Sequence, residues 1–157
     1  MSRCHALHRE QRPDVVIADV SLADGNGLDL VKELIAMNPA VKILVRSMHE
    51  ESLYAERSLR ASAKGYISKD EARTQLVNAV RQVLSGRVYL SSAMTDRMLN
   101  RSVRRTDPDR SPYDSLSDRE LEVFKQIGRG ISTRRIAANL YLSPKTIETY
   151  RENIKRS

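Results

Sequence analysis

Cysteine, tryptophan and long apolar runs are nearly or wholly missing from this 157-residue chain. Its single cysteine, Cys4, has no second cysteine with which to form an internal disulfide. The longest apolar run has four residues, as in Val15–Ala18, whereas a membrane-spanning helix needs about 20. Residues 1–5 also lack the apolar core of a signal peptide. These absences argue against a disulfide-stabilised scaffold and a membrane protein, and they predict a cytoplasmic location.

Acidic residues are the minority charge, because the chain has a net charge of +7. Residues 1–90 carry 13 Lys and Arg against 11 Asp and Glu, whereas residues 91–157 carry 14 against 9. A basic surface attracts polyanions such as nucleic acid without sequence preference, but a solvated surface has the same composition. The charge alone leaves both interpretations open, and a DNA-reading element in the same half would decide between them.

The first 86 residues alternate between strand and helix patterns. Residues 14–20 are apolar and β-branched, which is typical of a strand buried on both faces of a parallel sheet. The alternation predicts an α/β fold with right-handed crossovers. The predicted strands are 14–20, 41–45 and 64–68, and the predicted helices are 27–37, 51–62, 70–85 and, more briefly, 91–100. The residues expected on the buried helix faces include Leu53, Leu59, Ala72, Leu76, Val80, Val83 and Leu84.

The last 43 residues have a different pattern, of three short helices. Residues 101–114 are charged, contain proline and lack an apolar period, so they are expected to form an exposed linker. Ser117 and Glu120 have the spacing of a capping box, and Ser143 before Pro144 is a strong helix start. Three helices with tight turns predict a helix-turn-helix domain. Its second helix is expected to be capped by Ser132, and its core to contain Leu121, Phe124, Ile127, Ile136, Leu140, Ile147, Tyr150 and Ile154.

Three polar residues fall at the predicted strand ends, namely Asp19, Ser47 and Lys69. In an open parallel sheet, ligands bind beyond the carboxyl ends of the strands. A carboxylate there could accept a phosphoryl group as nucleophile, while an ammonium and a hydroxyl could hold phosphoryl oxygens. Three unrelated polar residues at the starts of loops would have the same spacing. The spacing therefore indicates a phosphoryl site but does not distinguish it from that alternative.

Several segments resemble a known family. Three of them are similar to the motifs of response-regulator receiver domains: PDVVIADVSLADGNGLDL, VRSMHE and AKGYISKD. A fourth resembles the LuxR-type helix-turn-helix: SLSDRELEVFKQIGRGISTRRIAANLYLSPKTIETYRENI. Two such domains in this order are similar to the NarL/FixJ subfamily of bacterial response regulators. The resemblance implies a doubly wound, flavodoxin-like receiver over 1–86, a short helix and linker over 87–114, and a small all-α DNA-binding domain over 115–157.

The resemblance also implies roles for single residues. Asp19 corresponds to the phosphoacceptor, Ser47 to the switch hydroxyl, Tyr66 to the rotating aromatic residue and Lys69 to the phosphate-pairing lysine. It further implies Mg²⁺ as cofactor, a cognate histidine kinase, a homodimer on double-stranded DNA and a regulator that is not an enzyme. In the third helix, Glu148, Thr149 and Glu152 correspond to base-reading positions, Lys145, Thr146 and Tyr150 to phosphate contacts and Arg151 to either, with Lys155 on the same exposed face.

The chain departs from the family pattern in three places. Family members usually have proline where Ala23 stands, so a looser loop is expected after Asp19. The acidic pair that binds Mg²⁺ in receivers is not found upstream of Asp14, where Glu10 is the one acidic residue and the segment is typical of the end of a helix. The fourth helix of LuxR-type domains has no counterpart either. The expectation is therefore a receiver without its first strand and helix, and an incomplete metal site at Asp19.

Two other functions compete with a phosphorylation-controlled regulator. A truncated fragment that binds DNA or a partner without being phosphorylated is the main alternative. A phosphatase of the haloacid-dehalogenase type would need a second aspartate two residues after the nucleophile, where Ser21 stands. A metal site formed by Cys4, His5 and His8 has too few ligands at unsuitable spacing.

Overall fold

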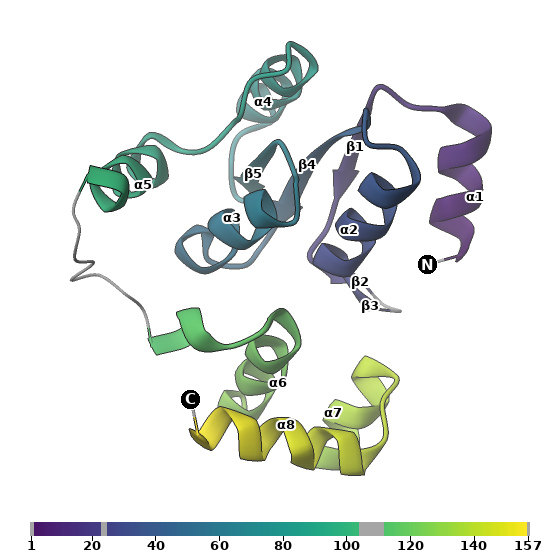
Figure 1. Cartoon of the computed structure of the whole chain (residues 1–157), viewed down its shortest axis with the longest axis vertical. Coiled ribbons are helices and arrows are strands. Elements are labelled where there is room, and N and C mark those ends of the chain that lie inside the picture. Colours follow the sequence, from purple (N-terminus) through teal and green to yellow (C-terminus); the bar gives the residue numbers. More distant parts are fainter. Residues whose placement is uncertain (1, 23–24, 104–111, 157) are drawn as a thin grey trace. The chain divides into compact units, whose positions relative to one another are not determined.

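The computed structural model describes residues 2–22, 25–103 and 112–156, and these form two compact units (Figure 1). The first unit contains helices α1 to α5 and the strands, and the second contains the helices that follow the linker. Ala23 and residues 104–111, which include most of the predicted linker, lie outside the described residues.

A parallel sheet lies at the centre of the first unit. Among the described residues it has three strands in the order β1-β4-β5, where β1 is Val15–Ala18, β4 is Lys42–Ser47 and β5 is Gly65–Ser68. β1 and β5 both pair with β4 in parallel. The short strands β2 (Ser21–Leu22) and β3 (Gly25–Asn26) pair with each other in the loop after β1. The predicted parallel α/β fold is therefore confirmed, with each strand within three residues of its predicted bounds.

Five of the described helices belong to the same unit as the sheet: α1 (Ser2–Gln11), α2 (Gly27–Met37), α3 (Glu51–Arg60), α4 (Arg73–Leu84) and α5 (Ser92–Val103). The residues of α4 pack against one face of the sheet, because Leu44 and Ile67 form one buried cluster with Ala79 and Val83. Neighbouring strand residues point to opposite faces of the sheet. Ile43 and Val45, which are equally buried, therefore lie on the other face. The helices α2 and α3 lie side by side in Figure 1.

The buried faces of two helices differ from those predicted. On α3 the buried residues are Tyr54, Ala55 and Ser58, while Leu53 and Leu59 are half-buried. Ser58 fits this face because its hydroxyl donates to the carbonyl of Tyr54 (2.7 Å) and leaves no unpaired donor. On α4 the prediction was wrong for Ala72, which is the N-cap residue before the helix and is exposed, and for Leu84, which is 39% exposed.

The second unit comprises the short 3₁₀ helix η1 (Pro112–Ser115) and the helices α6 (Asp118–Gly128), α7 (Thr133–Leu140) and α8 (Pro144–Arg156). Its core is a buried cluster formed by Val123, Ile136, Ala137 and Ile147. Phe124, predicted for this core, is only half-buried and lies against Tyr113 with ring centroids 5.2 Å apart. The other predicted core residues are buried or pack against the cluster as partly buried side chains: Leu121, Ile127, Leu140, Tyr150 and Ile154.

The helix starts of the second unit follow the sequence signals with one exception. The capping box is present, because Glu120 N donates to Ser117 Oγ (3.3 Å) and Ser117 N donates to the Glu120 carboxylate (2.9 Å). Thr146 N likewise donates to Ser143 Oγ (3.0 Å). Ser132 stands at the N-cap of α7, but its side chain makes no cap hydrogen bond, so the predicted cap is wrong.

Candidate functional sites

The carboxyl ends of the three strands bring the predicted phosphoryl-site residues to one edge of the sheet. Asp19 follows β1 directly, Ser47 is the last residue of β4 and Lys69 follows β5. Lys69 Nζ forms an ion pair with Asp19 Oδ2, and both side chains are about one-third exposed or less. A carboxylate and an ammonium group in contact at a partly open edge form a site that a phosphoryl donor can reach.

The loop after Asp19 is held by backbone contacts that the sequence did not reveal. Ser21 N donates to Asp19 Oδ1 (3.1 Å), which fixes the second carboxylate oxygen. Gly27 N donates to the carbonyl of Val20 (2.9 Å). A Cβ atom at Gly27 would lie 1.8 Å from the carbonyl oxygen of Asp19, so a side chain cannot be placed there without moving the backbone. Gly27 thus lets α2 begin in direct contact with the backbone of Asp19 and Val20.

Ser47 and Tyr66 lie buried behind this edge. Tyr66 is fully buried and its hydroxyl donates to the carbonyl of His49 (2.5 Å), while His49 N donates to Ser47 Oγ (3.2 Å). Burial raises the pKa of Tyr66 to about 12, opposed by a hydrogen bond with Ser47 and assisted by the charges of Glu51 and Asp19. Tyr66 is therefore a neutral hydrogen-bond donor at all physiological pH values.

His49 belongs to this arrangement although sequence reasoning assigned it no role. Its Nε2 lies 2.7 Å from Ser21 Oγ, and its ring stacks on Tyr54 with centroids 4.9 Å apart. Its backbone contacts both Ser47 and Tyr66. His49 therefore joins the loop after β4 to the loop after β1. The available sequence signal was its place two residues after Ser47, in the same motif.

The residues that the structure describes do not by themselves fit a Mg²⁺ ion. Mg²⁺ requires near-octahedral oxygen ligands. In the described part of the chain, no group of three or more His, Cys, Asp or Glu side chains could hold a metal. Both carboxylate oxygens of Asp19 already have partners, in Ser21 N and Lys69 Nζ. The side chains of Cys4, His5 and His8 lie outside the description.

Most of the predicted DNA-contacting residues lie on the outer side of α8, but Tyr150 does not. Its inner side is defined by Ile147, which is fully buried, and by the partly buried Tyr150 and Ile154 that pack on the same cluster. The outer side is therefore free to face a groove. Of the eight predicted residues, Lys145, Glu148, Thr149, Glu152 and Lys155 are exposed, and Thr146, Tyr150 and Arg151 are half-buried.

Both predicted base-reading glutamates of α8 have cationic partners on the same helix, and one also contacts α7. Glu148 Oε1 accepts from Thr133 Oγ1 (2.9 Å), and Arg151 Nε lies 3.7 Å from Glu148 Oε2. Lys155 Nζ donates to Glu152 Oε1 (2.8 Å), and this contact lowers the pKa of Glu152. The two glutamates are thus matched by cations, which reduces the repulsion that they would otherwise present to phosphates. Thr133 was not predicted for this site.

The chain is similar to known proteins in both of its units. Residues 2–81 match the family described as "Response regulator receiver domain", and residues 114–156 match "Bacterial regulatory proteins, luxR family". Response regulator GacA of Pseudomonas aeruginosa is 36% identical over 151 residues, which cover 96% of this chain and 70% of that protein. Oxygen regulatory protein NreC of Staphylococcus carnosus is also 36% identical, covering 92% of this chain and 69% of that protein.

Solved structures show the same architecture. A LuxR-family two-component response regulator from Aurantimonas sp. is 28% identical with a TM-score of 0.59, covering 66% of this chain and 74% of that one. RcsB from Salmonella enterica serovar Typhimurium, bound to promoter rprA, has a TM-score of 0.65 at 21% identity, covering 98% and 72%. The latter likeness concerns the fold alone. Among the described helices, none is long and apolar enough to cross a bilayer.

Proposed function

The chain belongs to the bacterial two-component response regulators that join a receiver domain to a LuxR-type DNA-binding domain, and we propose that Asp19 is its phosphoacceptor. The observation that supports this is the ion pair of Asp19 with Lys69 at the strand edge, beside the buried Ser47. Response regulators accept the phosphoryl group from a histidine kinase, so the partner proposed here is a cognate kinase.

In the proposed reaction, an Asp19 carboxylate oxygen attacks the phosphorus of a phosphohistidine. A P–O bond forms while the P–N bond breaks, and its electron pair leaves with the imidazole, which takes up a proton. Lys69 stays within reach of the phosphoryl oxygens, and the Ser47 hydroxyl donates to one of them. Since Tyr66 and Ser47 both contact His49, a shift of Ser47 toward the phosphoryl group alters the contacts of Tyr66.

Receiver domains of this family generally bind Mg²⁺ at the phosphorylation site. We propose that the described residues of this chain hold the ion weakly, because Asp19 supplies one carboxylate whose oxygens are both engaged. The same observation favours the alternative function, a DNA-binding or partner-binding chain that is not phosphorylated.

Acetyl phosphate with Mg²⁺ tests the proposal, with mass spectrometry to locate the phosphoryl group. Because the described residues hold Mg²⁺ weakly, we expect little label, rising with the Mg²⁺ concentration, on the peptide that contains Asp19, and its loss in Asp19→Asn. The control is Asp14→Asn, which removes an exposed carboxylate just before the same strand and should keep the label. A wild-type chain that takes no label at any Mg²⁺ concentration contradicts the role of Asp19 and leaves the alternative.

We also propose that α8 binds in the major groove of double-stranded DNA. RcsB is a protein of this fold whose structure contains promoter DNA, and the outer side of α8 carries the basic and polar residues expected of a reading helix. The proposed phosphate contacts are Lys145, Thr146 and Tyr150, and the proposed base contacts are Glu148, Thr149 and Glu152. Arg151 serves either purpose, Lys155 lies on the same exposed face, and a homodimer would place two such helices on one operator.

Fluorescence anisotropy with labelled duplexes at several salt concentrations tests this part. Lys145→Ala should weaken binding to all sequences alike and reduce the salt slope by about 1, because it removes one phosphate contact. Glu148→Ala should instead change the ranking of duplexes that differ in one base pair. Arg129→Ala, which removes an exposed cation at the end of α6, is the matched control. An unchanged ranking with Glu148→Ala counts against base reading.

We propose a receiver over 1–86, a helix and linker over 87–114 and the DNA-binding domain over 115–157. The protein is proposed to act in the cytoplasm, and its regulatory role requires no catalysis beyond the transfer to its own aspartate.

A further inference from the structure

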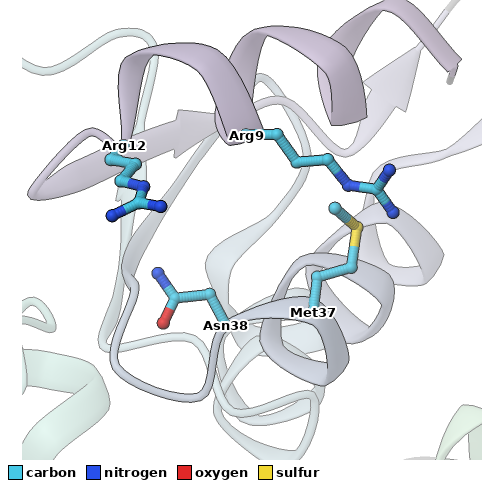
Figure 2. A pocket seen from close by; sticks show the side chains of 4 residues that line it. All are labelled: Arg9, Arg12, Met37 and Asn38. Carbon is cyan, nitrogen blue, oxygen red and sulfur yellow. The ribbon is translucent and has the colours of Figure 1, made fainter.

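A pocket lies between the end of α1 and the end of α2, on the receiver unit (Figure 2). Its volume is about 630 Å³, within the range of small-molecule pockets. The described residues that line it are Arg9, Arg12, Met37 and Asn38. They precede the first residues of β1 and β4, whereas Asp19 follows the last residue of β1. The pocket is therefore at the opposite edge of the sheet from the phosphoryl site.

Three of the described side chains that line the pocket carry hydrogen-bond donors, namely Arg9, Arg12 and Asn38. Neither Arg9 nor Arg12 forms a hydrogen bond or an ion pair with the described residues, and both side chains are exposed. Asn38 Oδ1 accepts from Ala40 N (3.1 Å), so its Nδ2 is the group left to donate. In Figure 2 this nitrogen lies on the side of Arg12, while Arg9 lies beside Met37. The backbone of Arg12 has φ 43°, an unusual conformation for a residue other than glycine.

We propose that this pocket binds a small phosphorylated molecule. The guanidinium groups of Arg9 and Arg12 would hold the phosphate oxygens as bidentate forks, and Asn38 Nδ2 would donate to a third oxygen. Met37 supplies an apolar wall for the organic part. A phosphate fits better than a carboxylate because it offers three terminal oxygens, to Arg12 and Asn38 on one side of the pocket and to Arg9 on the other. The volume admits a ligand of mononucleotide size.

Stabilisation of the neighbouring helix ends is an alternative explanation for the two arginines. Both α1 and α2 end at the pocket, and helix C-termini carry a partial negative charge of about one half that cations stabilise. However, the carbonyl of Leu34 already accepts from Asn38 N (2.9 Å), and neither arginine donates to a described carbonyl. Two full positive charges also exceed two half charges, so the pocket keeps an excess of positive charge.

Isothermal titration calorimetry of the full 157-residue chain with AMP and with pyrophosphate tests the proposal. Both should bind, and uncharged adenosine should not. Arg9→Gln and Arg12→Gln should each weaken AMP binding about tenfold, as expected when a charge-assisted contact is lost. Arg73→Gln, at the exposed start of α4, is the matched control and should bind like the wild type. Met37→Ala should weaken AMP more than pyrophosphate.

Three outcomes would overturn the proposal. If neither AMP nor pyrophosphate binds, or if the arginine variants only lower the melting temperature, the arginines merely stabilise the helix ends. If they instead weaken binding of a duplex of random sequence while AMP does not bind, the phosphate recognised is that of the DNA backbone. Asp19→Asn should leave AMP binding unchanged, and loss of AMP binding in that variant would place the ligand at the phosphoryl site. The phosphoacceptor role and this pocket can therefore fail separately.

Discussion

Tyr66 links the buried interior of the receiver to the loop after β4 through its neutral hydroxyl. Its hydroxyl reaches the carbonyl of His49, and its pKa is raised to about 12 by burial. Ionisation would place a phenolate in an apolar site near the carboxylates of Glu51 and Asp19. The hydrogen bond of Tyr66 therefore depends on the proton staying in place.

We expect this buried phenol to make the receiver sensitive to alkaline pH. The ordinary pKa is 10.0 and the folded-state pKa about 12, so the unfolded chain loses the proton first. The stabilisation is complete below pH 10 and is lost as pH rises toward 12, by about 2 kcal/mol at most. Urea unfolding should show this loss in the wild type relative to Tyr66→Phe. Parallel pH profiles for the two proteins would show that the phenol does not titrate on unfolding.

Gly27 is a position at which any side chain would clash with the backbone. A Cβ there would meet the backbone oxygen of Asp19 at 1.8 Å. Gly27→Ala should therefore displace the loop after β1, lower the free energy of unfolding by about 2 kcal/mol or more and speed hydrogen exchange in β1 and α2. Gly128→Ala is the control, because nothing lies within 4 Å of its Cβ position at the end of α6. It should be neutral or stabilising, since alanine favours helices over glycine. Equal losses in both variants would contradict the steric argument.

At the scale of elements, periodicity predicted which helices exist better than which faces they bury. The bounds of α2 were predicted to the residue because Asn26 and Asn38 flank a clear apolar repeat. The buried face of α3 was missed because Tyr54 and Ser58 are polar in type. Ser58 is nevertheless buried through a hydrogen bond to its own helix. Because such an i to i−4 bond lets a polar side chain face the core, residue polarity alone does not predict which face of a helix is buried.

The helix α5 is held on α3 by two carboxylates. Glu51 accepts from the backbone and the hydroxyl of Ser91, just before α5, and Glu56 pairs with Arg101 near its end (2.6 Å). Arg101→Gln should free the end of α5 and speed hydrogen exchange over residues 98–103. The increase should be about fivefold, equivalent to roughly 1 kcal/mol for a partly buried pair. Asp96→Asn, on the same helix and exposed, should leave exchange unchanged. Unchanged exchange with Arg101→Gln would mean that the pair does not hold the helix.

At the scale of the whole molecule, the sequence predicts those parts of the candidate phosphoryl site that follow from the order of the strands alone. Asp19, Ser47 and Lys69 meet because parallel strands end at one edge, which strand order implies. The contacts of His49 with Ser21 and Tyr66, and the pocket at Arg9 and Arg12, depend on loop paths and side-chain directions. These have no periodic signal in the sequence, so they became visible only in the structure.

The two units have separate cores, and this predicts that each can be damaged alone. Leu44 belongs to the cluster of the receiver and Ile147 to that of the DNA-binding unit, and both are fully buried. Truncating either to alanine leaves a cavity that costs about 2–5 kcal/mol. Such a loss is large for a unit of this size, because small domains bury too little surface for a wide margin.

Hydrogen exchange read by mass spectrometry distinguishes the units. Ile147→Ala should raise exchange throughout α6, α7 and α8 while β4 and β5 keep their protection, and Leu44→Ala should do the reverse. Val103→Ala is the matched control, because this side chain is 83% exposed and its truncation leaves no cavity. If either core variant raises exchange in both units to the same extent, the chain unfolds as one cooperative body. In that case the separate cores do not behave as independent domains, because each unit relies on the other for its stability.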